Sequence, residues 1–178
     1  KKISVFGSAR THSSAPTYKA AHKFGQLMQE AGYMVITGGG EGIMGAAQAG
    51  AGRQHGFALN IELPFEQKAN PYVTPELNFE FGYFHMRKMH FLLRARAVAV
   101  FPGGFGTFDE FFELLTLIQT GKMKPIPIML FGKDYWNRVI NFQALAEEGV
   151  IAPDDLKLFH FVETAEEGWD IVKAHYGL

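Results

Sequence analysis

The feature that most constrains the fold is a nine-residue stretch at 102–110, with the sequence PGGFGTFDE. It follows a short apolar run at 97–101, which is typical of a strand buried on both faces of a parallel sheet. Residues 111–120 then place apolar side chains at helical spacing. A glycine turn between a strand and a helix directs free N–H groups at one point, which favours an anion such as phosphate. The stretch therefore predicts a strand, an anion-binding turn and a helix.

Length and composition indicate a globular protein with one domain spanning residues 1–178, because 47% of its residues are hydrophobic and 20% are charged. The formal charge of −1 provides no general basic field that would recruit nucleic acid or an anionic membrane. The chain has no cysteine, which excludes disulfides, thiolate metal sites and cysteine nucleophiles. No apolar run approaches the roughly 18 residues of a membrane helix. We expect a cytoplasmic protein that binds neither nucleic acid nor membrane.

Strand-like and helix-like segments alternate along the chain. Strands are expected at 3–6, 33–37, 57–63, 97–101, 126–131 and 159–162, with a short extended piece at 78–82. Helices are expected at 16–30, from 43 to about 50, and at 83–96, 111–120, 135–148 and 165–176. Residues 64–75 contain three prolines and predict an irregular excursion across the surface or over a site. This alternation predicts an α/β fold, with an open, mostly parallel sheet and helices on both faces.

Residues 40–45 (GEGIMG) match the G-x-G-x-x-G pattern of dinucleotide-binding folds, and Glu62 stands where a ribose-binding acid would be expected. Taken alone, this pattern predicts NAD binding. However, it follows the second expected strand rather than the first, and further turns occur at Gly7–Ser8 and at 103–106. Turns at the carboxyl edge of a parallel sheet can all face one ligand, so they suit a mononucleotide at least as well as a dinucleotide. Each glycine cluster is also compatible with a tight turn that binds nothing.

Thr107 and Glu110 have the spacing of a capping box, with Thr107 as the N-cap of the following helix. A purely structural role would need nothing more. A carboxylate in the first helical turn beside an anion-binding turn would also lie near any bound sugar phosphate. Asp109 points about 100° around the helix and is the weaker candidate.

The expected helix at 83–96 is rich in cationic side chains. His85 and His90 are five residues apart and fall on different helical faces, so we expect no metal site. The remaining cations either form a solvated face or direct one or two side chains at a ligand; they are Arg87, Lys88, Arg94 and Arg96.

Several of these motifs together resemble one protein family. Residues 102–110 resemble the PGGxGTxxE signature of the Lonely Guy (LOG) family, whose members are often labelled "lysine decarboxylase-like". Residues 85–88 (HMRK) resemble its M-H-x-R-K segment, with Phe84 in place of the first methionine. Residues 37–44 and 59–67 resemble the longer bacterial branch, and the resemblance covers roughly residues 3 to 145.

The resemblance implies a Rossmann-like phosphoribohydrolase that splits cytokinin nucleotides or AMP into free base and ribose 5-phosphate, without a cofactor and as at least a homodimer. It places Arg87 and Glu110 at the catalytic positions. Glu66 is the match for an acid on the base side. Together with the glycine turns, the expected substrate-binding residues are Ser8, Gly39, Gly40, Glu66, Lys88, Gly103, Gly104, Gly106, Thr107 and Thr116.

The chemistry suits these residues. Breaking an N-ribosyl bond builds oxocarbenium character at the anomeric carbon, and a nearby carboxylate either stabilises that charge or activates the attacking water. Arg87 would hold the ribose phosphate, or Glu110 itself, through a charge-assisted fork. Two alternatives stay open: a non-catalytic carrier of a nucleotide or phosphorylated cofactor, and an NAD-binding protein. A pyridoxal-dependent decarboxylase would need a Schiff-base lysine with a partner for the pyridine nitrogen, and no such arrangement is apparent. The aromatic residues between 79 and 112 indicate either a large core or a subunit interface.

Overall fold

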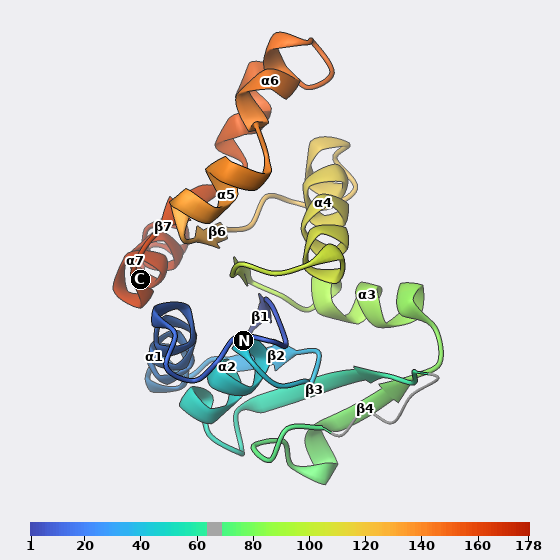
Figure 1. Ribbon diagram of the computed structural model, residues 1–178, viewed down its shortest axis with the longest axis vertical. Helices are drawn as coiled ribbons and strands as arrows, with labels where there is room; N and C mark the ends of the chain where they lie inside the picture. The colour runs from blue at the N-terminus through green and yellow to red at the C-terminus, as the bar shows by residue number, and fades with distance from the viewer. Residues whose placement is uncertain (64–68) are drawn as a thin grey trace.

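The computed structural model describes residues 1–63 and 69–178. The described strands form one seven-stranded sheet in the order β4-β3-β2-β1-β5-β6-β7 (Figure 1). Every pairing is parallel. The predicted α/β class with a parallel sheet is therefore confirmed. The strands are β1 (Lys2–Phe6), β2 (Met34–Thr37), β3 (Gly56–Ile61), β4 (Asn78–Phe81), β5 (Ala97–Val100), β6 (Ile128–Phe131) and β7 (His160–Val162).

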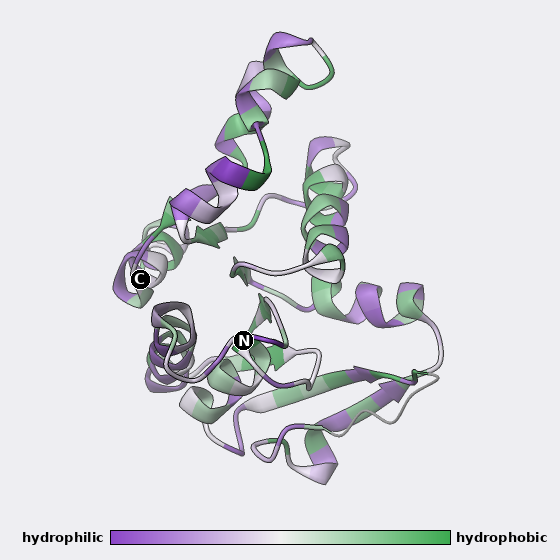
Figure 2. Cartoon of the chain, viewed as in Figure 1, coloured by the Kyte–Doolittle hydropathy of each residue, from purple (hydrophilic) through white to green (hydrophobic). Residues whose placement is uncertain are grey.

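Helices cover both faces of the sheet, and the side chains of β5 show why. Ala97 and Ala99 belong to the core cluster beneath one layer of helices, whereas Val98 and Val100 belong to the cluster beneath the other. Successive strand residues point to opposite faces, so a strand covered on both sides is apolar throughout. In Figure 2, the interior strand β6 is coloured as hydrophobic, whereas the edge strand β4 carries hydrophilic segments. The first layer contains α1 (Pro16–Glu30), α2 (Ile43–Ala51) and α7 (Ala165–Tyr176); the second contains α3 (Phe84–Leu93), α4 (Phe105–Gln119), α5 (Lys133–Val139) and α6 (Phe142–Glu147).

The sheet has a topological switch point at β1. Its neighbours are β2 on one side and β5 on the other, with Phe6 paired to Val100 at the carboxyl end. The loops that leave β1 and β5 lead to helices in different layers, which opens a crevice between them. This crevice is where the glycine turns of the sequence meet.

Three segments refine the sequence-based prediction. The single helix expected at 135–148 is wrong: Ile140 is extended, and Asn141 caps a separate α6 by accepting a hydrogen bond from the Ala144 N–H. The expected piece at 78–82 is β4, which pairs with β3 at the sheet edge. Part of the irregular excursion lies outside the described residues. Two 3₁₀ helices, Pro75–Leu77 and Pro153–Lys157, complete the described elements. None of the described helices is both long enough and apolar enough to cross a bilayer.

Candidate active site

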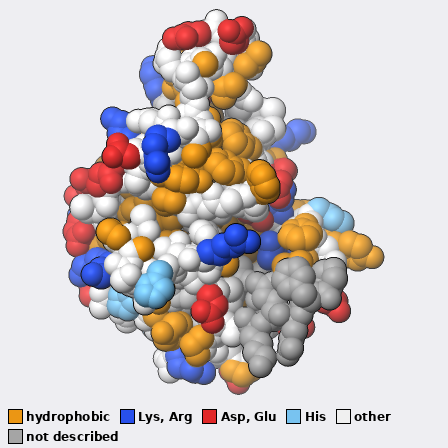
Figure 3. Space-filling model, viewed as in Figure 1, with side chains coloured by type: hydrophobic (Ala, Val, Ile, Leu, Met, Phe, Trp, Pro, Cys, Tyr) orange, Lys and Arg blue, Asp and Glu red, His pale blue; other side chains and the backbone are white. Residues whose placement is uncertain are grey.

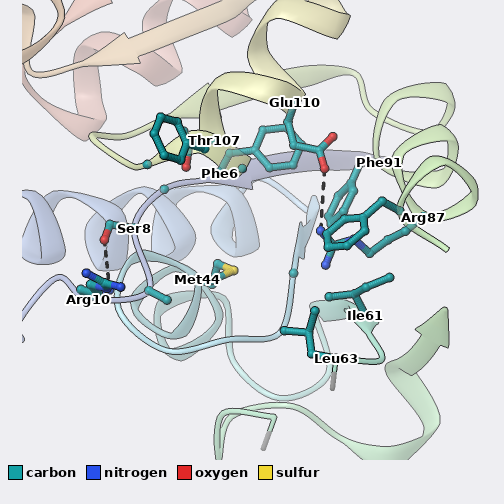
Figure 4. A pocket seen from close by; sticks show the side chains of 17 residues that line it. Phe6, Ser8, Arg10, Met44, Ile61, Leu63, Arg87, Phe91, Thr107 and Glu110 are labelled. Carbon is teal, nitrogen blue, oxygen red and sulfur yellow. Dashed lines mark hydrogen bonds and ion pairs between the residues drawn. The ribbon is translucent and has the colours of Figure 1, made fainter. Parts of the chain in front are cut away.

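A pocket of about 570 Å³ lies at the switch point, between the loops that follow β1, β2 and β5 (Figure 4). Residues from the ends of β1 and β3 and from α2, α3 and α4 complete its wall. The charged side chains that line it are Arg10, Arg87 and Glu110. The other lining residues are Phe6, Gly7, Ser8, Ala9, Gly38, Met44, Ile61, Leu63, Phe84, Phe91, Gly104, Phe105, Gly106 and Thr107.

Ser8 joins the three loops that surround the pocket. Its N–H donates to the carbonyl oxygen of Pro102 at 3.0 Å, and its carbonyl oxygen accepts from the N–H of Ile43 at 3.0 Å. Its hydroxyl oxygen accepts from the N–H of Arg10 at 3.0 Å. The loop after β1 is thus fixed against the start of α2 and against the turn that precedes α4.

The turn before α4 differs from the predicted capping box, which is wrong. The helix begins at Phe105, with Gly104 as an N-cap that contributes no side-chain hydrogen bond. Thr107 and Glu110 both lie inside the helix, one turn apart, and both line the pocket. Gly103 leaves room for the Thr107 side chain, which a Cβ at position 103 would overlap. The Phe108 N–H donates to the carbonyl oxygen of Gly104 at 3.1 Å, whereas the N–H groups of Phe105, Gly106 and Thr107 precede this first helical bond and meet no capping side chain in the described part of the chain. This helix start therefore favours an anion.

Arg87 and Glu110 form a buried pair at the other end of the pocket (Figure 4). Nη2 of Arg87 lies 3.9 Å from Oε1 of Glu110, and their side chains are 14% and 7% exposed. The Arg87 guanidinium carbon lies 5.2 Å from the centre of the Phe84 ring and 5.5 Å from that of Phe91. A single long contact joins Arg87 and Glu110 rather than a fork, and the alternative fork from Arg87 to the ribose phosphate stays a prediction.

Burial is the largest influence on the pKa values of Glu110 and Arg87. It raises the pKa of Glu110 to about 7, with the nearby positive charge of Arg87 acting in the opposite direction. Burial also lowers the pKa of Arg87, partly offset by Glu110. Nε of Arg87 and Oε2 of Glu110 are buried and have no hydrogen-bond partner in the described part of the chain. Such atoms are costly to leave unpaired, which indicates a site prepared for a polar ligand.

Comparison with known proteins identifies the family. The family model described as "Possible lysine decarboxylase" matches residues 26–172. The cytokinin riboside 5′-monophosphate phosphoribohydrolase LOG of Oryza sativa subsp. japonica is 29% identical over 174 residues, covering 94% of this chain and 70% of the relative. The chain belongs to the LOG family. Another member, LOG7 of Arabidopsis thaliana, is 28% identical over 177 residues, covering 94% of this chain and 78% of its own.

Solved structures share the fold of this LOG-family chain. The molybdenum cofactor binding protein of Rippkaea orientalis superposes with a TM-score of 0.71 at 21% identity, covering 98% of this chain and 96% of its own. The Moco carrier protein of Chlamydomonas reinhardtii superposes with a TM-score of 0.66 at 22% identity, covering 99% and 97%. At these identities the likeness extends to the Rossmann-like α/β fold.

Two residues that the LOG resemblance assigns to the substrate lie away from this pocket. Lys88 Nζ lies 2.8 Å from Asp109 and 3.6 Å from Glu113, which hold it on the outer side of α4. Thr116 lines a separate surface hollow, and its hydroxyl donates to the carbonyl oxygen of Phe112 at 2.8 Å. A helix turns about 100° per residue, so the side chain of Lys88 points away from the direction of Arg87. For the same reason, Thr116, six residues after Glu110, points to a different side of α4 from Glu110.

The loop after β2 is fixed from behind by a residue that the sequence analysis missed. Asn70 is buried, and its Nδ2 lies 3.1 Å from the carbonyl oxygen of Gly39, 2.9 Å from that of Gly40 and 2.5 Å from Oε1 of Gln48. Gly38 faces the pocket, whereas Gly39 and Gly40 stand behind its wall. Gly39 has φ of +76°, and a Cβ there would overlap Asn60. The two glycines shape the loop rather than line the cavity.

Replacing Asn70 tests this support. Asn70→Ala is expected to lower the free energy of unfolding by about 1–3 kcal/mol, because it leaves buried polar groups unpaired. Asn137→Ala, at an exposed position on α5, is the matched control and should change stability by less than about 0.5 kcal/mol. Urea denaturation measures the free energy of unfolding of both variants and of wild type. Equal stability of the two would show that Asn70 does not support the loop.

The sequence analysis also missed most of the apolar lining. Phe6 and Ile61 end their strands, and this position was the available signal, because strand ends border ligands at a switch point. Three further residues reach the pocket through the tertiary packing of α2 and α3, which the sequence alone does not reveal; they are Met44, Phe84 and Phe91. Glu66, the expected base-side acid, lies outside the described residues. No group of three or more potential metal-ligating side chains occurs within residues 1–63 and 69–178.

The raised pKa of Glu110 gives a pH-dependent stability. The pKa is about 7 in the folded protein against an ordinary value of 4.5, so the folded state binds this proton more tightly. The stability that the protonated Glu110 contributes to the folded state is fully present below pH 4.5 and is lost as the pH rises through about 7. The unfolding free energy of wild type relative to Glu110→Gln should thus fall by on the order of 3 kcal/mol across this range. Urea denaturation at several pH values measures the difference; a difference independent of pH would contradict the burial of an ionisable group here.

Proposed function

We propose that this chain hydrolyses the N-glycosidic bond of a purine nucleoside 5′-monophosphate, a cytokinin riboside 5′-monophosphate or AMP, to free base and ribose 5-phosphate. The observation that carries the proposal is the buried Glu110 carboxyl, 3.9 Å from Arg87 and in the same pocket as the uncapped start of α4. A carboxylate and an anion-binding turn in one cavity provide the two functions that this reaction requires.

In the proposed reaction, the ionised form of Glu110 acts on the anomeric carbon. It stabilises the oxocarbenium charge or activates the attacking water, and either role requires the carboxylate. Burial disfavours that form, and the neighbouring Arg87 cation favours it. Arg87 thus tunes Glu110, and its buried Nε has no hydrogen-bond partner in the part of the chain that the structure describes. The α4 start and Ser8 bind the 5′-phosphate.

The remaining lining supports a purine as the leaving group. Met44, Ile61 and Leu63 present apolar side chains in the same cavity. Ligand pockets of this kind combine apolar walls with a few placed polar groups. The names of the LOG relatives in Oryza sativa and Arabidopsis thaliana, which are cytokinin riboside 5′-monophosphate phosphoribohydrolases, support the same reaction.

We also propose that the chain associates into at least a homodimer through the outer face of α3. Hydrophobic side chains gather on the molecular surface (Figure 3), and several of the large exposed ones belong to this helix or adjoin it. Exposed apolar patches of this kind mark interaction sites. Met86, Met89 and Leu93 lie on this face, and Tyr83 adjoins the start of the helix.

Two other functions can be separated from hydrolysis. A carrier of a phosphorylated cofactor is a candidate because the fold is shared with molybdenum cofactor binding proteins. Such a carrier would bind a nucleotide and return it intact. A pyridoxal-dependent lysine decarboxylase is disfavoured, because the described residues that line the pocket include no lysine for a Schiff base.

The experiment measures the binding of a panel of nucleoside 5′-monophosphates and of NAD by calorimetry, and then separates the products of each incubation by chromatography. Hydrolysis predicts equal amounts of free base and ribose 5-phosphate from one or more monophosphates and an unchanged NAD sample. Binding of a monophosphate without release of its base would favour the carrier. Binding of NAD in preference to AMP would favour the dinucleotide interpretation of residues 40–45.

A further inference from the structure

The pocket contains two arginines in contrasting environments. Arg87 is buried between aromatic rings and faces Glu110. Arg10 is exposed, and none of the ion pairs found within residues 1–63 and 69–178 involves it. Figure 4 shows Arg10 beside Ser8, well separated from Arg87 and Glu110 across the pocket. The two guanidinium groups therefore meet different parts of any ligand that fills this cavity.

The backbone of Arg10 is held in place although its side chain is exposed. Its N–H donates to Ser8 Oγ, and Ser8 in turn bonds to the loops that precede α2 and α4. A Cβ at Gly42 would overlap the backbone of Ser8 and Ala9, so these loops are in close contact. The backbone of Arg10 is thus fixed where three loops meet, and its side chain extends from there at the end of the pocket that contains Ser8.

The shape of the substrate assigns the two arginines different roles. In a nucleoside 5′-monophosphate, the phosphate is carried on C5′ beyond C4′, across the ring oxygen from the anomeric carbon C1′. With Glu110 at the anomeric carbon, the phosphate extends away from Arg87, toward the end that contains Ser8 and Arg10. A guanidinium group binds two phosphate oxygens at once, which a lysine ammonium cannot reproduce.

We propose that Arg10 is a specificity-determining residue that binds the 5′-phosphate and selects a nucleoside monophosphate over the corresponding nucleoside. This inference rests on the proposed function for the position of the reacting bond. Arg10 contributes to binding, whereas Arg87 and Glu110 carry the bond cleavage. The hydroxyl of Ser8 provides a neighbouring polar contact, since its oxygen accepts the Arg10 N–H and its hydrogen has no acceptor among the described residues.

The test combines substrate kinetics with a binding measurement that needs no turnover. Arg10→Ala, Arg10→Lys and the control Arg138→Ala, an exposed arginine on α5, are titrated with ribose 5-phosphate by calorimetry and assayed with AMP and adenosine. Arg10→Ala should raise the Kd for ribose 5-phosphate and the KM for AMP by about 10–100-fold, while kcat changes by less than about 3-fold. Arg10→Lys should recover part of the affinity, and the effect should shrink at high salt. Arg138→Ala should match wild type.

The two proposals fail in distinguishable ways. Binding of ribose 5-phosphate that Arg10→Ala weakens, without hydrolysis of any nucleotide by wild type, would support Arg10 and overturn the proposed reaction. Equal ribose 5-phosphate affinity of Arg10→Ala and wild type, or no binding by wild type, would overturn the role of Arg10. A fall in kcat at constant KM would also overturn it, because the residue would then act on the transition state alone.

Discussion

Glu110→Gln is expected to lower the turnover of the preferred nucleotide by about 10²–10⁴-fold, the range for loss of a positioned acid or base. Glutamine keeps the size of the side chain and removes its negative charge, so it cannot stabilise an oxocarbenium ion or activate water. The position is buried in the first half of α4, where a neutral side chain is easier to accommodate than a carboxylate. Steady-state kinetics, with circular dichroism to confirm folding, measures the effect.

Asp109→Asn is the matched control for this variant. Asp109 is adjacent in sequence and also carboxylic, but its side chain is exposed and paired with Lys88. Its replacement should leave kcat within about 3-fold of wild type. Near wild-type hydrolysis by Glu110→Gln, or equal losses in both variants, would refute the assignment of Glu110.

Arg87→Met is expected to lower kcat/KM at pH 7 by about 10²–10³-fold, which is the scale for removing a charged group that stabilises a reacting centre. Without the guanidinium, the pKa of Glu110 should rise further, because burial is then less opposed. The rising limb of the pH–rate profile should move to higher pH in this variant. Methionine fills much of the space between Phe84 and Phe91, which limits the loss of packing.

Two further variants define the role of Arg87. Arg94→Met removes an exposed cation that caps the same helix and lies outside this pocket, so its kinetics should match wild type. Arg87→Lys keeps the charge without the planar group and should recover part of the activity. A loss in Arg87→Met with an unshifted pH profile would contradict the tuning of Glu110 by Arg87.

The sheet could be predicted from the sequence because its signals are local. The apolar run that contains β5 has alanine toward one helical layer and valine toward the other, and a strand with two buried faces needs little else. Part of the site could be predicted for the same reason, because its residues belong to short sequence motifs; they are Ser8, Arg87, Glu110 and the turn at 103–107. The structure brings Glu110, Arg87, Ser8 and Thr107 into one pocket.

The errors arose where rotation or distant contacts decide the outcome. Helix α4 begins at Phe105 rather than after an N-cap at Thr107: Gly104 is the N-cap without a side-chain hydrogen bond, and Gly103 leaves room for the Thr107 side chain inside the helix. Lys88 and Thr116 were assigned to the substrate by the family resemblance, and in this structure α3 and α4 turn them away from the cavity. Asn70 supports Gly39 and Gly40 from 31 and 30 residues away, a separation at which sequence spacing carries no information.

The most direct test of the central claim mixes nucleoside 5′-monophosphate with an excess of protein, stops the reaction after one turnover and separates the products by chromatography. We predict that wild type converts the bound nucleotide completely into equal amounts of free base and ribose 5-phosphate. Glu110→Gln should bind the same nucleotide and return it uncleaved. Recovery of intact nucleotide from wild type, under conditions where binding is saturated, would contradict the proposed hydrolysis.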